Sequence, residues 1–238
     1  MLKVLVACEE SQRVCSAFRK LGHEAYSCDL INESGNHPEW HIKGDCLSVI
    51  NGNCDFVTRG GQAISIKGEW DLIVAHPPCT YLSHVATWSH SLKHTPLDKI
   101  NNRTEQRIEA MKFFMAIVNA KCEHIAVENP VGVMNTCYRS PDQIIEPYMF
   151  AESVDDVDNY VTKRTCLWLK GLPLLNGNDL PKPDNKKLFG VRANGRANCW
   201  MEKVKGDTKT RAKIRSKTFT GIANAIAEQW GEYLENIK

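Results

Sequence analysis

The 238-residue sequence predicts an α/β fold built on a mixed, mostly parallel sheet with helices on both faces. Short apolar runs alternate with apolar residues at helical spacing from residue 2 to residue 127, as in a series of strand–helix–strand units. The runs are apolar throughout, which is typical of parallel strands covered on both faces. Most of them stop abruptly at acidic residues, glycine or proline, and ligands bind at the carboxyl edge of such sheets.

The first unit covers residues 2–29. We expect an apolar strand over 2–7, a helix over 10–21 and a second strand over 25–28, which ends in Asp29. This order is typical of the opening of a Rossmann-like fold, in which an acid after the second strand can bind ribose hydroxyls. The loop between strand and helix contains no glycine and so offers no cradle for a pyrophosphate. A nucleoside ligand without phosphates remains open.

The central strand is expected at residues 72–75, and His76, two prolines and Cys79 follow it. The prolines cannot donate to a sheet and disfavour helix, so the loop after this strand is stiff. Cys79 therefore lies at the tip of a stiff loop at the ligand edge. A thiol held there is either a nucleophile or one more packed cysteine.

The other elements follow from the same patterns. A third strand should end near Gly44, and a long loop over 83–102 carries three histidines. Their spacing fits no tetrahedral metal site, so we expect no metal. The remaining expected elements are a loop or short hairpin at 51–69, an amphipathic helix at 103–120, a strand at 125–127 ending in Glu128, a short helix at 141–149, a strand at 160–169, a linker at 172–185 and a C-terminal helix within 218–237.

The net charge of +2 conceals a basic segment, residues 182–217. This basic segment contains twelve lysines and arginines but three acidic residues, a local charge of +9. Clustered cations release counterions from nucleic-acid phosphates. The segment is therefore either a polyanion-binding surface or a solvated basic face.

Cysteine usage and hydropathy suggest the compartment. The ten cysteines form no C-x-x-C pair and several lie inside apolar strands, which favours reduced thiols. No apolar run approaches the ~20 residues of a membrane span, and the first residues pass directly into a strand without a signal-peptide pattern. We therefore expect a cytoplasmic protein.

Cys79 and Glu128 follow strands separated by one predicted helix, so both should lie at one sheet edge. Addition of a thiolate to C6 of cytosine makes C5 nucleophilic, and an acid at N3 takes up the developing charge. With these residues the sequence resembles the DNA cytosine-5 methyltransferases over residues 2–169 and 215–236. Three motifs are similar to those of the family: Pro77-Pro78-Cys79 to its nucleophile loop, Glu128-Asn129-Pro130 to its Glu-Asn-Val motif, and residues 220–225 to its closing Gly-Asn segment.

The resemblance implies an S-adenosylmethionine-dependent methyltransferase fold and methylation of cytosine C5 in duplex DNA with the base flipped out. It implies a catalytic domain over 1–169, a small basic target-recognition region over 170–214 and a C-terminal helix over 215–238 that returns to the catalytic domain. The implied catalytic residues are Cys79 as nucleophile, Glu128 at N3, and Arg164. The implied S-adenosylmethionine-binding residues are Cys8, Glu9, Ser11, Asp29 at the ribose, Asp45 at the adenine, Pro77 and Asn224, and the implied substrate-binding residues are Pro78, Asn129 and Lys163.

The sequence departs from the family at three places. The glycine-rich loop after the first strand is absent, the second arginine of the Gln-x-Arg-x-Arg segment is replaced by Cys166, and the recognition region is small. Three alternatives remain open. The chain could methylate an amino group of adenine or cytosine, although His76 and Cys79 are not the flanking residues that this chemistry uses. It could instead act on a free nucleotide or RNA, or be a catalytically silent nucleic-acid-binding module.

Overall fold

In the computed structural model, which describes residues 1–84 and 91–238, a seven-stranded sheet has the order β3-β2-β1-β6-β7-β9-β8. The strands from β3 to β7 are parallel, and β9 runs antiparallel to both of its neighbours. The predicted mixed, mostly parallel α/β sheet is therefore confirmed. Its strands are β1 (Lys3–Ala7), β2 (Glu24–Asp29), β3 (His41–Lys43), β6 (Leu72–Ala75), β7 (Ile125–Pro130), β8 (Gln143–Ile145) and β9 (Thr165–Lys170).

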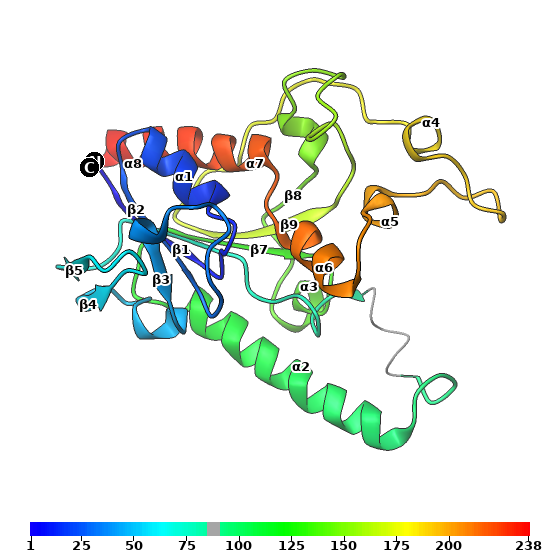
Figure 1. The fold of residues 1–238 in the computed structure, drawn as a ribbon, viewed down its shortest axis with the longest axis horizontal. Coiled ribbons are helices and arrows are strands. Elements are labelled where there is room, and N and C mark those ends of the chain that lie inside the picture. Colours follow the sequence, from blue (N-terminus) through cyan, green and yellow to red (C-terminus); the bar gives the residue numbers. More distant parts are fainter. Residues whose placement is uncertain (85–90) are drawn as a thin grey trace.

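Helices cover both faces of the sheet (Figure 1). On one face, α1 (Arg13–Lys20) packs with α7 (Thr220–Ala225), a π-helical turn η5 (Ile226–Trp230) and α8 (Gly231–Ile237). On the other face lie α2 (Leu97–Val118) and α3 (Met134–Cys137), and the separate hairpin of β4 (Cys54–Val57) and β5 (Ala63–Ile66) also packs there. The structure also contains η1 (Pro38–Trp40), η2 (Cys46–Ser48), η4 (Pro147–Phe150), α4 (Asn185–Phe189), α5 (Trp200–Lys203) and α6 (Thr208–Ser216).

The central strands form because both of their faces are buried. Every residue of β6 and four of the five residues of β1 are buried. Side chains from alternate positions of these strands enter two separate apolar layers, one under α1 and one over α2. Continuous apolar sequence is the pattern that parallel strands between two helical layers require.

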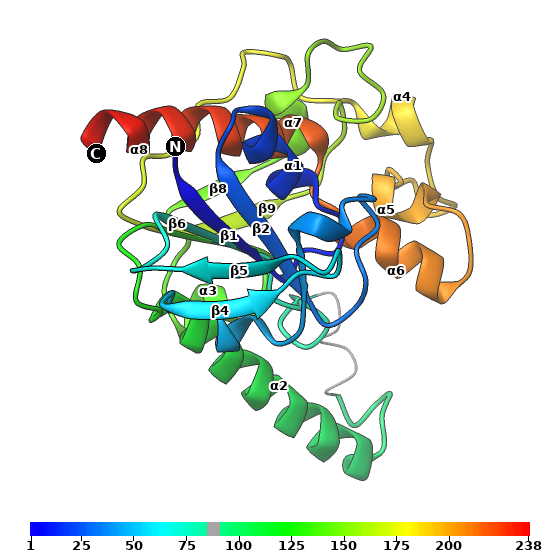
Figure 2. The ribbon, with the colours of Figure 1, turned by 60° about the vertical axis from the view of Figure 1, so that its left-hand side comes forward.

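The C-terminal segment returns to the start of the chain. Arg13 donates a hydrogen bond of 2.6 Å from Nη1 to the carbonyl of Thr218, just before α7. Trp230 is fully buried in the layer that contains Phe18 of α1. Figure 2 shows both chain ends at the same end of this layer, where the Met1 amino group lies 3.1 Å from the carboxylate of Glu235.

Three expected elements differ from the structure. The helix predicted at 141–149 is wrong, because residues 143–145 pair with β9 as an edge strand and Pro147 starts a short 3-10 turn. The loop predicted over 83–102 is wrong at its end, since α2 begins at Leu97 directly after a proline. The strand predicted at 160–169 begins five residues late, at Thr165. Within the predicted loop, residues 85–90 lie outside the described part of the chain and include His90.

The third strand and the hairpin are confirmed: β3 ends directly before Gly44, and β4 and β5 occupy most of the region 51–69. Among the helices of the described residues, none has the length and apolar character needed to cross a membrane.

Candidate functional site

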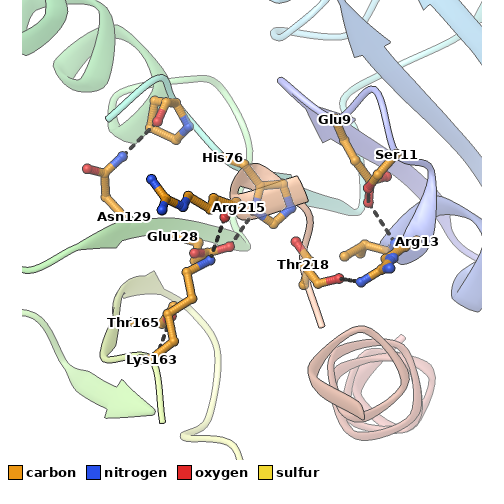
Figure 3. Close-up of polar contacts among 12 residues, drawn as sticks. Glu9, Ser11, Arg13, His76, Glu128, Asn129, Lys163, Thr165, Arg215 and Thr218 are labelled. Atoms are coloured by element: carbon orange, nitrogen blue, oxygen red, sulfur yellow. Dashed lines mark hydrogen bonds and ion pairs between the residues drawn. The ribbon is translucent and has the colours of Figure 1, made fainter. Parts of the chain in front are cut away.

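The candidate site lies where the strand order reverses. From β1 the chain adds β2 and β3 on one side, and it then adds β6 and β7 on the other. In open α/β sheets this switch point, at the carboxyl ends of the strands, is where ligands bind. Figure 3 shows the side chains that the strand ends bring together there: Glu9 after β1, His76 after β6 and Glu128 near the end of β7.

A largely buried histidine–carboxylate pair forms the centre of the site. His76 Nδ1 lies 2.8 Å from Oε2 of Glu128. Burial alone would lower the pKa of His76, but the hydrogen bond and charge of Glu128, together with Glu9, raise it above its ordinary value. Burial would likewise raise the pKa of Glu128, but His76 and Lys163 lower it. Each member of the pair thus favours the charged form of the other, and His76 Nε2 is buried without a hydrogen-bond partner among the described residues.

Cys79 lies at an exposed position in the loop that follows β6. Its carbonyl accepts hydrogen bonds from the backbone of Leu82 at 3.1 Å and Ser83 at 2.9 Å, which close a tight turn behind it. Desolvation by the surrounding protein raises the pKa of the thiol, and Glu128 also raises it, whereas the positive charge of Lys163 lowers it. The resting thiol is therefore protonated, and Lys163 is the neighbour that favours its ionisation.

The loops after β6 and β7 are bonded to each other. Asn129 Nδ2 donates to the carbonyl of Pro77 at 2.7 Å, and the backbone N–H of Val133 donates to the carbonyl of Leu82 at 2.8 Å. Gly132 forms a backbone bridge with Ser83 at the same place. A Cβ on Gly132 would lie 2.0 Å from the Leu82 carbonyl oxygen, so a side chain cannot be accommodated. These contacts fix the Cys79 loop relative to Glu128.

Asn129 thus makes a structural contact, although sequence analysis assigned it to substrate. Its amide is buried, and its Oδ1 remains without a hydrogen-bond partner in the described part of the chain. Pro77 is buried beneath it and Pro78 is exposed beside Cys79. Asn129 therefore aligns the two loops and still has one acceptor available.

Lys163 links the site to the basic segment. Its Nζ donates to the carbonyl of Arg215 at 3.1 Å and lies 5.6 Å from the centre of the Phe219 ring. Figure 3 shows Lys163 and Arg215 beside the His76–Glu128 pair. Arg164, the next residue, is exposed directly before β9.

Cys166, which stands at the position of a family arginine, is fully buried in β9 opposite Asn129. Its sulphur accepts a hydrogen bond from Asn135 at 3.5 Å. This position therefore belongs to the apolar layer of the sheet and presents no cation.

The loop from β1 to α1 holds three residues assigned to the cofactor. The Glu9 carboxylate accepts hydrogen bonds from the backbone of Val14 at 2.7 Å and Cys15 at 3.1 Å, so it caps the N-terminus of α1. The hydroxyl of Ser11 lies 3.4 Å from the same carboxylate. Cys8 has a left-handed backbone, with φ 59°, and its sulphur lies 3.9 Å from that of Cys46. All three polar side chains thus make contacts within the protein.

Glu10, a residue that sequence analysis did not select, is different. Its side chain is buried, and both carboxylate oxygens lack a hydrogen-bond partner among the described residues. Lys213 of α6 approaches one oxygen to 3.7 Å. A buried carboxylate with no hydrogen bonds is costly, which marks it as a candidate for binding a cation or a donor. In the sequence, the signal that could have indicated Glu10 was the pair of acidic residues at 9–10 directly after a predicted strand.

Asp29 lies near Glu10 at the end of β2. Its carboxylate accepts one hydrogen bond from the backbone of Ile31 at 3.1 Å, and burial and the charge of Glu10 raise its pKa. The next two residues, Leu30 and Ile31, are apolar but 70% and 54% exposed. This edge therefore combines a carboxylate with an open apolar surface.

The two remaining cofactor candidates are exposed. Asp45 caps η2 by accepting from the backbone of Leu47 at 3.0 Å, and the loop that contains it is joined to β2 by a hydrogen bond from Gly44 to Asp29. This hydrogen bond places Asp45 near Asp29 at the end of β2. Asn224 lies on the solvent side of α7. No hydrogen bond of the described residues links Asn224 to the other cofactor candidates.

No protein-family model matches the chain, and a search of curated proteins finds no match. Function must therefore be argued from the geometry of the site.

Proposed function

We propose that this protein transfers a methyl group from S-adenosylmethionine to C5 of a cytosine in DNA. One observation carries the proposal: the loops after β6 and β7 are bonded together and hold an exposed thiol, Cys79, beside a largely buried carboxylate, Glu128, at the switch point of the sheet. A nucleophilic thiol and a charged hydrogen-bonding group in one cleft suit addition to a pyrimidine ring. The motif resemblance agrees with this chemistry.

The residues at the neighbouring strand ends fit S-adenosylmethionine. Asp29 can accept from ribose hydroxyls, and the exposed apolar surface of Leu30 and Ile31 suits the face of an adenine. Glu10 offers two buried oxygens without hydrogen-bond partners, which suit the ammonium of the methionine portion. When bound, the cofactor supplies an electrophilic methyl group.

In the first step, the exposed thiol of Cys79 releases its proton to solvent, and the thiolate adds to C6 of the flipped cytosine. The S–C6 bond forms, the π electrons shift to C4–C5, and N3 gains a proton. Because the pKa of Glu128 is lowered, its carboxylate has no proton of its own to donate. His76 supplies it: the imidazolium passes its proton to Glu128, which passes it to N3. His76 is the residue that the resemblance did not anticipate in this role.

In the second step, the electrons at C5 would form the bond to the methyl group as the bond between that methyl group and the sulphonium sulphur breaks, and S-adenosylhomocysteine would leave with the electron pair. The C5 proton then leaves to a base, the S–C6 bond breaks to restore the aromatic ring, and N3 returns its proton. Lys163 favours the thiolate both as nucleophile and as leaving group, because its charge lowers the pKa of Cys79.

The test uses duplex DNA in which 5-fluorocytosine replaces cytosine on one strand. Fluorine at C5 blocks loss of the proton, so the enzyme should remain covalently attached in the presence of S-adenosylmethionine. Cys79→Ser should abolish both the adduct and turnover on ordinary DNA. Cys137→Ser is the matched control, because Cys137 is also an exposed free cysteine and should leave the adduct intact.

Two results would refute the proposal. Methylation that continues at near wild-type rate in Cys79→Ser would indicate amino-group chemistry. If the labelled methyl group of S-adenosylmethionine is transferred to dCMP or RNA but not to duplex DNA, then the substrate is a free nucleotide or RNA.

A further inference from the structure

Two arginines of α2 lie against the loop that carries Cys79. Arg107 Nε donates to the carbonyl of Tyr81 at 2.9 Å, and the guanidinium carbon of Arg103 lies 5.3 Å from the centre of the Tyr81 ring. The two arginines are four residues apart and so occupy adjacent turns on one side of the helix. Lys99 lies one further turn toward the N-terminus on the same side. Tyr81 is two residues from Cys79, so this basic row begins beside the nucleophile loop.

Nothing in the described part of the chain neutralises these arginines. Neither forms an ion pair with a carboxylate there, and Arg103 Nε and Arg107 Nη2 are buried without hydrogen-bond partners. Burial and the charge of Arg103 lower the pKa of Arg107. Two like charges held together with unused donors are unfavourable unless an anion binds them, and planar guanidinium groups match phosphate oxygens.

The surroundings indicate which anion. Cys79 also lies within electrostatic reach of Lys163, whose Nζ donates to the carbonyl of Arg215 in helix α6. Helix α6 belongs to the basic segment, and its Lys213 reaches the β1–α1 loop. Cationic groups of α2 and of the region around α6 therefore both lie close to the Cys79 loop. A mononucleotide carries phosphate on one side of its sugar, whereas a polynucleotide carries a phosphate on each side of the flipped nucleotide. The cationic groups near the Cys79 loop therefore fit a polynucleotide better.

We propose that Arg103 and Arg107 bind a backbone phosphate of duplex DNA beside the Cys79 loop. The inference rests on the proposed function and assigns two residues that hold its DNA substrate. Phosphate contacts position a nucleic acid without reading its sequence, which suits a chain whose recognition region is small.

The experiment measures binding of a fluorescent 25-base-pair duplex of mixed sequence by anisotropy at several salt concentrations. R103Q/R107Q should bind about tenfold more weakly or worse at low salt. The slope of log K against log salt should fall by about 2, close to one for each lost phosphate-binding cation. R103K/R107K retains the charges and should keep most of the slope.

The matched control is K112Q/K121Q, which removes the same charge at an exposed position in α2 and at another exposed position three residues beyond the helix. It should change the slope by much less. Thermal melting of each variant checks that loss of the Arg107–Tyr81 contact has not unfolded the protein; R103K/R107K provides a folded comparison if R103Q/R107Q melts early.

An unchanged affinity and slope in R103Q/R107Q would overturn the inference, as would weakened binding to RNA with unchanged binding to the duplex. The failure of the proposed function looks different. In that case, no adduct forms at Cys79 on 5-fluorocytosine DNA although the arginine variants lose duplex binding. If the adduct forms normally but the arginine variants bind duplex like the wild type, then the phosphate site is refuted and the proposed function stands.

Discussion

At the scale of single residues, the His76–Glu128 pair ties the stability of the site to pH. The pKa of His76 is raised above 6.5, so its stabilising charge is fully present below about pH 6.5 and is lost as pH rises through the folded value. The pKa of Glu128 is lowered below 4.5, so its contribution is present above about pH 4.5 and is lost as pH falls through the folded value. Both contributions are complete between these limits.

Glu128→Gln should therefore destabilise the protein most near pH 5.5, where a charged histidine would be left buried without its partner. The expected loss in the free energy of unfolding is on the order of 3 kcal/mol at pH 5.5 and should shrink by pH 9. Urea unfolding at the two pH values measures it. Glu105→Gln, at an exposed position in α2, is the control and should show little change at either pH. An equal loss at pH 5.5 and pH 9 would contradict an ion pair.

At the scale of elements, Gly132 joins the two loops of the site. Gly132→Ala places a methyl group 2.0 Å from the Leu82 carbonyl, so the loops must separate. We expect lower thermal stability and a larger loss of adduct formation at Cys79, because the loop then no longer holds the thiol beside Glu128. Gly44→Ala is the matched control, since no atom lies within 4 Å of a Cβ there. Adduct formation that is equal in both variants would show that the contact does not position Cys79.

Some elements of the fold are predictable from local sequence patterns, and others are not. The buried strands and the ends that carry Cys79 and Glu128 were predictable, because continuous apolar runs, prolines and polar ends are local signals. The edge strand β8 was not, since its three residues are a strand through pairing with β9, which is distant in sequence. The start of α2 was hidden by polar residues, because most of its first turns are exposed.

The same distinction applies to the site residues. His76 was visible in the sequence but its role depends on Glu128, 52 residues away, which only the sheet brings into contact. Glu9 looked like a ligand-binding acid, yet its carboxylate caps α1 while Glu10 remains without hydrogen bonds. Two adjacent acids cannot be distinguished without knowing which one points toward the helix amides. The arginines of α2 form a recognisable row only once the helix is known to begin at Leu97.

At the scale of the whole molecule, the basic segment and the α2 arginines are separate cationic surfaces of one chain. Several lysines of the basic segment are exposed and form no ion pair within the described residues, among them Lys203, Lys205 and Lys209. If one duplex spans both surfaces, their contributions to binding should be independent and should add. A ligand that contacts one surface alone would leave the other without effect.

The Lys203→Gln, Lys205→Gln and Lys209→Gln triple variant should therefore lower the slope of log K against log salt by at most about 3, because each phosphate contact contributes about 0.9. Affinity should fall alike for duplexes of different sequence, since contacts to phosphate carry no base information. Combined with the changes at Arg103 and Arg107, the loss in slope should equal the sum of the separate losses. Anisotropy at four salt concentrations measures each variant. A combined loss no greater than that of the triple variant would mean that the two surfaces do not hold the same DNA molecule.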